Sequence, residues 1–181
     1  MTITYKLNES DFLIHHLYIA SQSERIKKKR QRNKVRLPII YLAFAVLTFF
    51  LEMSYVTPLF IIIGILWYFL YPLWERRHYI NHYKGFISET NKDSFDSIVT
   101  LDISNDFIDA KDRGGEGKIF TSELTELNEI PSTIFIRLKG GSSIILPKDR
   151  IDNIAEVRAK LMELADYLKI KYTIDDKWEW K

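Results

Sequence analysis

The sequence predicts an α+β protein in which a two-helix transmembrane hairpin precedes a small antiparallel sheet, or partly open barrel, with a C-terminal helix. Three observations predict this layout. Residues 37–74 contain a single charged residue, Glu52, although charged residues make up 28% of the chain. Short segments between residues 97 and 146 alternate apolar and polar positions with the period of two typical of strands. Residues 151–168 then carry one apolar stripe at helical spacing.

Charge is distributed unevenly along the 181 residues, whose net charge is +2. Residues 1–74 hold nine basic and four acidic residues, a net charge of +5, whereas residues 75–181 hold 17 basic and 20 acidic residues, a net charge of −3. The basic excess therefore lies beside the apolar block, and the mildly acidic remainder argues against nucleic acid as a partner. The absence of cysteine excludes disulfides, thiolate nucleophiles and Cys-zinc sites.

The first 36 residues are expected to form a strand–helix arm. Alternating apolar residues predict a short strand over residues 2–7, and the polar residues 8–11 supply N-caps for a helix that can run on toward Leu37. The basic stretch of residues 25–36 has two interpretations. It attracts anionic head groups, worth about 1 kcal/mol per basic residue near the surface, or it only sets the topology, and the two roles can coexist.

Two apolar runs, residues 37–51 and 55–74, are separated by a short turn. Crossing about 30 Å of hydrocarbon takes about 20 apolar residues, which the second run supplies by itself. The first run is long enough if Arg36 snorkels and the turn of residues 52–54 lies at the far interface. The alternatives are a shallow re-entrant hairpin and a hairpin buried in a soluble domain, for which the rest of the chain is too short.

The flanking charges predict that both termini are cytoplasmic. Residues 25–36 hold eight basic residues and no acid, residues 76 and 77 are arginines, and the turn between the runs has no Lys or Arg. We therefore expect a multi-pass protein of the cytoplasmic (cell or inner) membrane. The residues expected to contact anionic lipid are Arg25, Lys27, Lys28, Lys29, Arg30, Arg32, Lys34, Arg36, Arg76 and Arg77.

After the hairpin (residues 37–74), we expect a helical linker over residues 75–94, a sheet-and-helix domain over residues 95–172 and a tail over residues 173–181. Because short antiparallel strands cannot cover their own apolar face, the final helix, with Asp149 as its N-cap, completes the core. The expected strands cover residues 97–103, 107–111, 118–121, 124–130, 133–138 and 143–146.

This order of arm, basic stretch, hairpin and sheet-plus-helix domain ends in the segment IFIRLKGGSSIILPKDRI, residues 134–151. It resembles the YcxB-like family of bacterial membrane proteins, whose C-terminal domain is similar to pleckstrin-homology folds. The resemblance covers nearly the whole chain, and its most specific piece is residues 133–151. It implies a pleckstrin-homology-like domain and a membrane address, and it brings no established catalytic residues to transfer.

Few residues are candidates for metal binding, phosphate binding or catalysis. His78 and His82 have a spacing that can chelate a metal, but no carboxylate is placed as a third ligand. The glycine-rich residues 114–117 lack the Lys-Ser/Thr of a phosphate loop and are interpreted as a hairpin turn. The domain's loops are poor in net positive charge, and the only nearby basic pair, Lys148 and Arg150, is separated by Asp149, which argues against specific lipid recognition there. We find no catalytic constellation and expect no enzyme activity, cofactor or metal.

The tail contains Trp178 and Trp180 between charged residues. They either dock at the bilayer interface or on a partner, or cover the edge or helix of the domain.

These features predict a non-enzymatic integral membrane protein that presents a cytoplasmic pleckstrin-homology-like domain for protein or lipid interaction. Its expected partners are the lipid bilayer and a protein, either an unidentified one or a second copy of the chain. The alternative is a small membrane immunity or defence protein that neutralises a membrane-acting toxin. The chain's size and composition allow this alternative without selecting it, and a toxin-like neighbour in the same operon would discriminate between the two.

Overall fold

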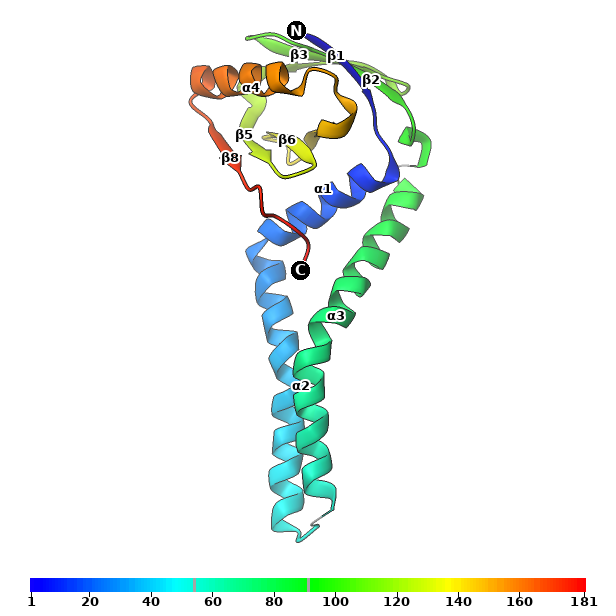
Figure 1. Ribbon diagram of the computed structural model, residues 1–181, viewed down its shortest axis with the longest axis vertical. Helices are drawn as coiled ribbons and strands as arrows, with labels where there is room; N and C mark the ends of the chain where they lie inside the picture. The colour runs from blue at the N-terminus through cyan, green and yellow to red at the C-terminus, as the bar shows by residue number, and fades with distance from the viewer. Residues whose placement is uncertain (54, 91) are drawn as a thin grey trace. The chain divides into compact units, whose positions relative to one another are not determined.

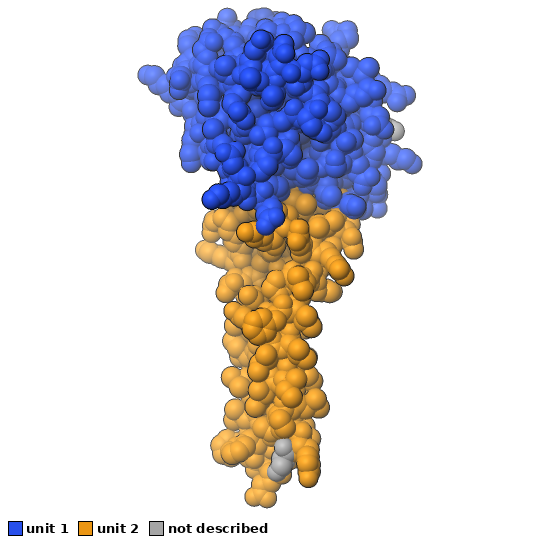
Figure 2. Space-filling view, viewed as in Figure 1, with its two compact units in different colours: residues 1–15, 84–179 blue, residues 16–83, 180–181 orange. Residues whose placement is uncertain are grey.

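The computed structural model describes residues 1–53, 55–90 and 92–181, except for the side chain of residue 93 (Figure 1). Residue 54 of the expected turn and residue 91 of the expected linker lie outside this description. The chain forms two compact units, shown in Figure 2. Unit 1 comprises residues 1–15 and 84–179, and unit 2 comprises residues 16–83 and 180–181.

Unit 1 contains two four-stranded sheets, and the first includes the N-terminal strand. Its order is β1-β2-β3-β4, with every pair antiparallel. In the register of β1, Ile3 lies opposite Leu101 and Tyr5 opposite Val99. The alternation of residues 2–7 predicts the strand but not its distant partner. The four strands are β1 (Thr2–Lys6), β2 (Ile98–Ile103), β3 (Phe107–Asp112) and β4 (Gly115–Phe120).

The second sheet has the order β7-β6-β5-β8 and is not closed into a barrel. Its pairs are antiparallel except for β5 and β8, which are parallel because a helix carries the chain across between β7 and β8. The sequence assigns no strand to the region of β8. The strands are β5 (Leu124–Glu129), β6 (Thr133–Leu138), β7 (Ser143–Pro147) and β8 (Lys171–Ile174).

Helix α4 (Ile154–Leu168) covers the core of unit 1 with its predicted apolar stripe, in which Val157, Leu161 and Leu164 are fully buried. The predicted N-cap, Asp149, is wrong. The chain makes a 3-10 turn over Lys148–Arg150 and returns to extended backbone before the helix, so Asn153 occupies the N-cap position.

In the described ranges, three α-helices precede β2. Helix α1 (Glu9–Gln22) is followed by Ser23, whose side chain accepts a hydrogen bond from the backbone N–H of Ile26 and thereby caps a new helix. That helix, α2 (Glu24–Phe50), joins the basic stretch and the first apolar run in one element. After the turn, α3 (Val56–Thr90) joins the second apolar run to the expected linker helix, so Pro72 lies in its interior.

Helices α2 and α3 lie side by side in unit 2 (Figure 1), and their apolar side chains point outward. Among the described residues, 29 large hydrophobic side chains are exposed, and 22 of them lie between Ile39 and Trp74. Both helices are long and apolar enough to cross a membrane, and only 11% of the most apolar window of each is buried. A helix in the core of a soluble domain would be mostly buried.

Small and polar groups fill the contact between the two apolar runs. The Thr48 and Thr57 hydroxyls lie 3.0 Å apart, and the Phe60 ring stacks with Phe44 at 5.5 Å between centroids. A Cβ atom on Gly64 would lie 3.5 Å from the Tyr41 Cβ, an ordinary van der Waals contact, so Gly64 faces α2 with room for a methyl group. Small residues and hydroxyls in such contacts are typical of helix pairs packed in lipid.

Candidate functional site

All ten basic residues predicted to contact lipid lie in unit 2, eight on α2 and two on α3. Antiparallel packing places the two groups at one level, because the Arg30 guanidinium on α2 contacts the Glu75 carboxylate, the neighbour of Arg76 and Arg77. The structure therefore brings together two basic segments that are about 40 positions apart in the chain.

The depth of this basic level can be compared with a bilayer. Residues 25–36 rise about 16 Å along a helix, whereas the head-group region of one leaflet is about 5–8 Å thick. For a hairpin standing along the bilayer normal, the contact between Arg30 and Glu75 sets Arg30 and its neighbour Lys29 at the level where α3 leaves its apolar run, next to that layer. The basic residues nearer Arg25 would reach into water and act at longer range.

Arg30 forms part of a polar cluster inside unit 2, together with Glu75 and Tyr71. Its Nε donates to Glu75 Oε2 at 3.0 Å, and the Tyr71 hydroxyl donates to Glu75 Oε1 at 2.8 Å. Glu75 and Tyr71 are both buried. Because breaking a buried pair leaves an uncompensated charge, Arg30 is better explained as a structural residue than as a lipid contact.

Trp180 packs on the same cluster. Its side chain is 5% exposed, and its ring lies 4.7 Å from the Arg30 guanidinium and 5.5 Å from the Tyr79 ring. The sequence leaves two possibilities for the tail tryptophans: docking at the bilayer interface or on a partner, or covering the edge or helix of the domain. Trp180 does neither in the structure, because it packs on α2 and α3 within unit 2. Trp178 belongs to unit 1 and is half-buried.

Two other predicted lipid contacts have partners within the hairpin. The Lys34 amine lies 4.2 Å from the Tyr68 ring centroid, and Lys27 pairs with Glu24 at 2.9 Å on the helix surface. Within the described ranges, the remaining seven form no ion pair. They are Arg25, Lys28, Lys29, Arg32, Arg36, Arg76 and Arg77.

A polar hollow of about 250 Å³ opens between α2 and α3 at this level. One of its walls carries His78, whose ring stacks on Trp74 at 5.1 Å between centroids. In the part of the chain that the structure describes, His78 and His82 belong to no cluster of three potential metal ligands. The lining residues are Lys29, Asn33, Tyr71, Trp74, Glu75, His78, Tyr79 and His82.

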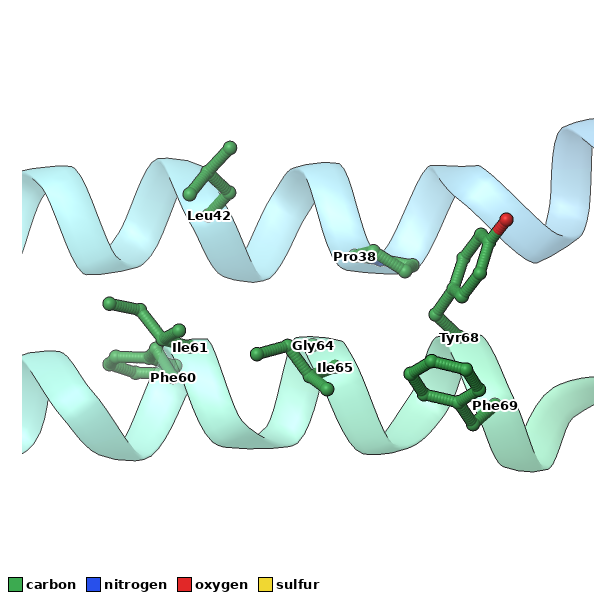
Figure 3. Close-up of a pocket in the computed structure, with 8 residues that line it drawn as sticks. All are labelled: Pro38, Leu42, Phe60, Ile61, Gly64, Ile65, Tyr68 and Phe69. Atoms are coloured by element: carbon green, nitrogen blue, oxygen red, sulfur yellow. The ribbon is translucent and has the colours of Figure 1, made fainter.

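An apolar groove of about 280 Å³ lies deeper along the hairpin, between the two runs (Figure 3). Two of its lining residues lie on α2 and six on α3. Its chemistry suits an aliphatic chain or a neighbouring apolar helix. The groove is lined by Pro38, Leu42, Phe60, Ile61, Gly64, Ile65, Tyr68 and Phe69.

The main polar cluster of unit 1 surrounds Glu129, a fully buried residue at the end of β5. Its carboxylate accepts hydrogen bonds from Lys148 Nζ at 2.8 Å, Arg158 Nε at 3.0 Å and the Tyr172 hydroxyl at 2.7 Å. Burial raises the pKa of Glu129, but these three donors outweigh it and leave the pKa below its ordinary value. The cluster joins β5 to the turn after β7, to α4 and to β8.

A second buried carboxylate, Asp11, holds Arg150. The guanidinium donates to both carboxylate oxygens, with Nη1 at 2.8 Å from Oδ2, and also to the backbone oxygen of Lys6 at 3.1 Å. Asp11 is the strongest cause of the raised pKa of Arg150. Lys148 and Arg150, the basic pair near the loops, thus each form an ion pair with a buried carboxylate.

The sequence pattern alone did not identify Glu75, Glu129 and Asp11 as partners of these cations. For Glu129 a signal exists, because strand alternation from the buried Leu127 places it on the inward face. A carboxylate at an inward position predicts a buried cation. For Asp11 and Glu75 the partners lie 139 and 45 positions away, and only the tertiary fold brings them together.

Comparison of the chain with protein-family models, with curated proteins and with solved structures finds no match.

Proposed function

We propose that the chain is a non-enzymatic integral membrane protein, in which the α2–α3 hairpin holds the sheet-and-helix domain at the cytoplasmic surface for contacts with other proteins. The observation that carries this proposal is the outward-facing apolar surface of the hairpin. Side chains such as Phe50 and Phe69 are 77% and 70% exposed. Apolar surface of this extent in water would cause aggregation, whereas in lipid it is solvated.

The charges at the hairpin's open end support the cytoplasmic orientation. Helix α2 reaches its apolar run through the basic stretch, and α3 leaves its run through Arg76 and Arg77. The described part of the turn contains Glu52 and no basic residue. Under the positive-inside rule, the end that carries the basic residues stays in the cytoplasm together with the domain.

A strand edge supports protein contact as the role of the domain. Strand β4 is the last of its sheet, and its residues are almost all exposed. An edge strand presents unpaired backbone N–H and C=O groups, which an extended peptide of a partner can extend as a further strand. Phe120, at the end of β4 and 61% exposed, offers an apolar contact beside that edge.

The resemblance to the YcxB-like family fits this proposal. The family's C-terminal domain is similar to pleckstrin-homology folds, which combine a small sheet with a C-terminal helix. In this chain the corresponding elements are the strands from β2 to β7 and helix α4. We include membership in that family, and its membrane address, in the proposal.

Photo-crosslinking in native membranes tests both parts of the proposal. A photoreactive amino acid is placed at Phe120 on β4 or, as a matched control, at Met162, which is 40% exposed on α4. The membranes are irradiated first and then washed with carbonate, so that covalent adducts survive and only integral proteins with their adducts remain. We expect a discrete adduct with another protein from position 120 and none from position 162. Loss of the protein in the wash, or no adduct from position 120, would refute the proposal.

A further inference from the structure

We propose that the hollow at the open end of the hairpin binds the phosphate of an anionic phospholipid head group, with Lys29, His78 and His82 as its donors. This inference rests on the proposed membrane insertion and goes beyond it, because it replaces diffuse attraction to a basic stretch with one lipid in a defined site. All residues of the hollow belong to unit 2.

The level of the hollow matches that of lipid phosphates. Trp74 ends the apolar run of α3, and His78 follows it by four residues, about 6 Å along the helix axis. The head-group region extends about 5–8 Å beyond the hydrocarbon, so His78 falls inside it. Lys29 lies at the same level, because its neighbour Arg30 contacts Glu75, the residue after Trp74.

The charge of the hollow favours an anion. Its carboxylate, Glu75, is neutralised internally, since one oxygen accepts from Arg30 and the other from Tyr71. Lys29 is exposed and, among the described residues, forms no ion pair. The hollow therefore presents a cation whose charge no neighbouring carboxylate cancels.

Two imidazoles add donors on one wall. His78 and His82 are four residues apart and so share a face of α3. The His78 ring is held parallel to Trp74, with an interplanar angle of 12°, and the His82 ring lies 5.4 Å from Tyr83. Because helical side chains lean toward the N-terminus, His82 leans toward the level of His78. Each imidazole offers a phosphate oxygen an N–H donor, beside the charge-assisted donor of Lys29.

The size of the hollow fits a head group. Its volume of about 250 Å³ is below the range of roughly 300–1,000 Å³ typical of pockets for drug-sized ligands. A phosphate with a small polar substituent fills such a space, while the acyl chains of the same lipid stay in the bilayer beside the apolar runs.

Native mass spectrometry of the full chain released from lipid nanodiscs tests the inference. The nanodiscs contain phosphatidylcholine with a minor fraction of phosphatidylglycerol. We expect the wild-type protein to retain one phosphatidylglycerol, and both the Lys29→Gln variant and the His78→Gln/His82→Gln variant to retain it roughly tenfold less. The matched control is Lys28→Gln, which removes the same charge from the neighbouring exposed position outside the hollow and should retain the lipid.

Three results would overturn the inference. Equal loss in Lys28→Gln would show that only general basic attraction holds the lipid. Displacement of the lipid by millimolar inorganic phosphate would assign the hollow to soluble phosphate. Absence of bound phosphatidylglycerol from a wild-type protein that enters nanodiscs would refute the lipid site and leave the proposed function standing, whereas failure to enter nanodiscs would refute both.

Discussion

The two units differ in where their large apolar side chains lie. In unit 1 the interior is apolar, with residues such as Phe135 and Leu161 almost inaccessible, and the buried carboxylate Glu129 is matched by two cations and a hydroxyl. In the hairpin of unit 2 the large apolar side chains are exposed, and the residues buried between its helices include Ala45 and Thr48.

This contrast supports the proposed membrane insertion, in which the two regions face different solvents. A water-facing domain gains stability by removing apolar area from solvent. A helix pair in lipid gains nothing from that transfer and is held by close packing and hydrogen bonds. The following four predictions test the contrast, beginning with the largest expected effect.

Removing the Glu129 carboxylate should strongly destabilise unit 1. In Glu129→Ala, Lys148 and Arg158 lose a fully buried counter-charge, and we expect a loss of roughly 3–5 kcal/mol in the free energy of unfolding. The control is Glu123→Ala, which breaks an exposed pair with Lys139 and should cost at most about 1 kcal/mol. Hydrogen exchange of β5 and β6 peptides measures both changes, and equal costs would contradict the structural role of the cluster.

A charge in the middle of the hairpin should prevent insertion. Ile62 on α3 is 53% exposed, and Ile62→Arg places a guanidinium where lipid is expected. On insertion scales, one such charge at the centre of a helix raises the free energy of insertion by about 2.5–3.5 kcal/mol. Tyr167 on α4 is 63% exposed, and Tyr167→Arg should change stability by no more than about 0.5 kcal/mol. The membrane-inserted fraction of each variant, measured by carbonate extraction, checks the difference. Similar behaviour of the two would mean that both regions face water.

The two units should respond to acid over different pH ranges. Burial lowers the pKa of His16 in unit 2, so the unfolded chain takes up a proton first, and stability is lost as the pH falls below about 6.5. The lowered pKa of Glu129 makes unit 1 lose stability only as the pH falls below the ordinary value near 4.5.

Hydrogen exchange resolved by peptide and by pH measures both transitions. One proton limits each slope to about 1.4 kcal/mol per pH unit. His16→Gln should flatten the upper transition alone and Glu129→Gln the lower one alone; the reverse assignment would contradict these two pKa shifts.

The smallest effect is expected at Gly64, which faces Tyr41 in the contact between the two helices. In Gly64→Ala the new methyl group meets ordinary van der Waals contacts at 3.5 Å, and the gain in helix propensity is at most about 1 kcal/mol. Gly64→Leu, in contrast, should force the helices apart. Thermal unfolding in detergent compares the two variants, and a large loss with alanine would show that the pair is packed more tightly than the structure indicates.

Local pattern predicts most of the elements. Alternation over residues 133–138 predicts β6, and the apolar stripe of residues 151–168 predicts α4. The two apolar runs predict the α2–α3 hairpin. Each of these signals is a period or a length, which is a property of a short segment. The break at Ser23 and the late start of α4 depend on single backbone conformations that periodicity does not encode.

Long-range partners could not be predicted from the sequence. The pairing of β1 with β2, the parallel β8 and the ion pair between Asp11 and Arg150 join residues that are far apart in the chain. At the candidate site, the basic residues were predictable as a set. The ion pair that Arg30 forms with Glu75 was not predictable, because only the antiparallel packing of α2 against α3 brings the two residues together.

The most direct test of membrane insertion is cysteine accessibility in intact cells, and the chain contains no cysteine of its own to interfere. Single variants Glu52→Cys, Ile62→Cys and Asp152→Cys are treated with a membrane-impermeant maleimide before and after permeabilisation. We expect labelling of position 52 in intact cells, of position 152 only after permeabilisation, and of position 62 in neither case. Labelling of positions 52 and 152 under the same condition, or ready labelling of position 62, would contradict a hairpin that crosses the membrane.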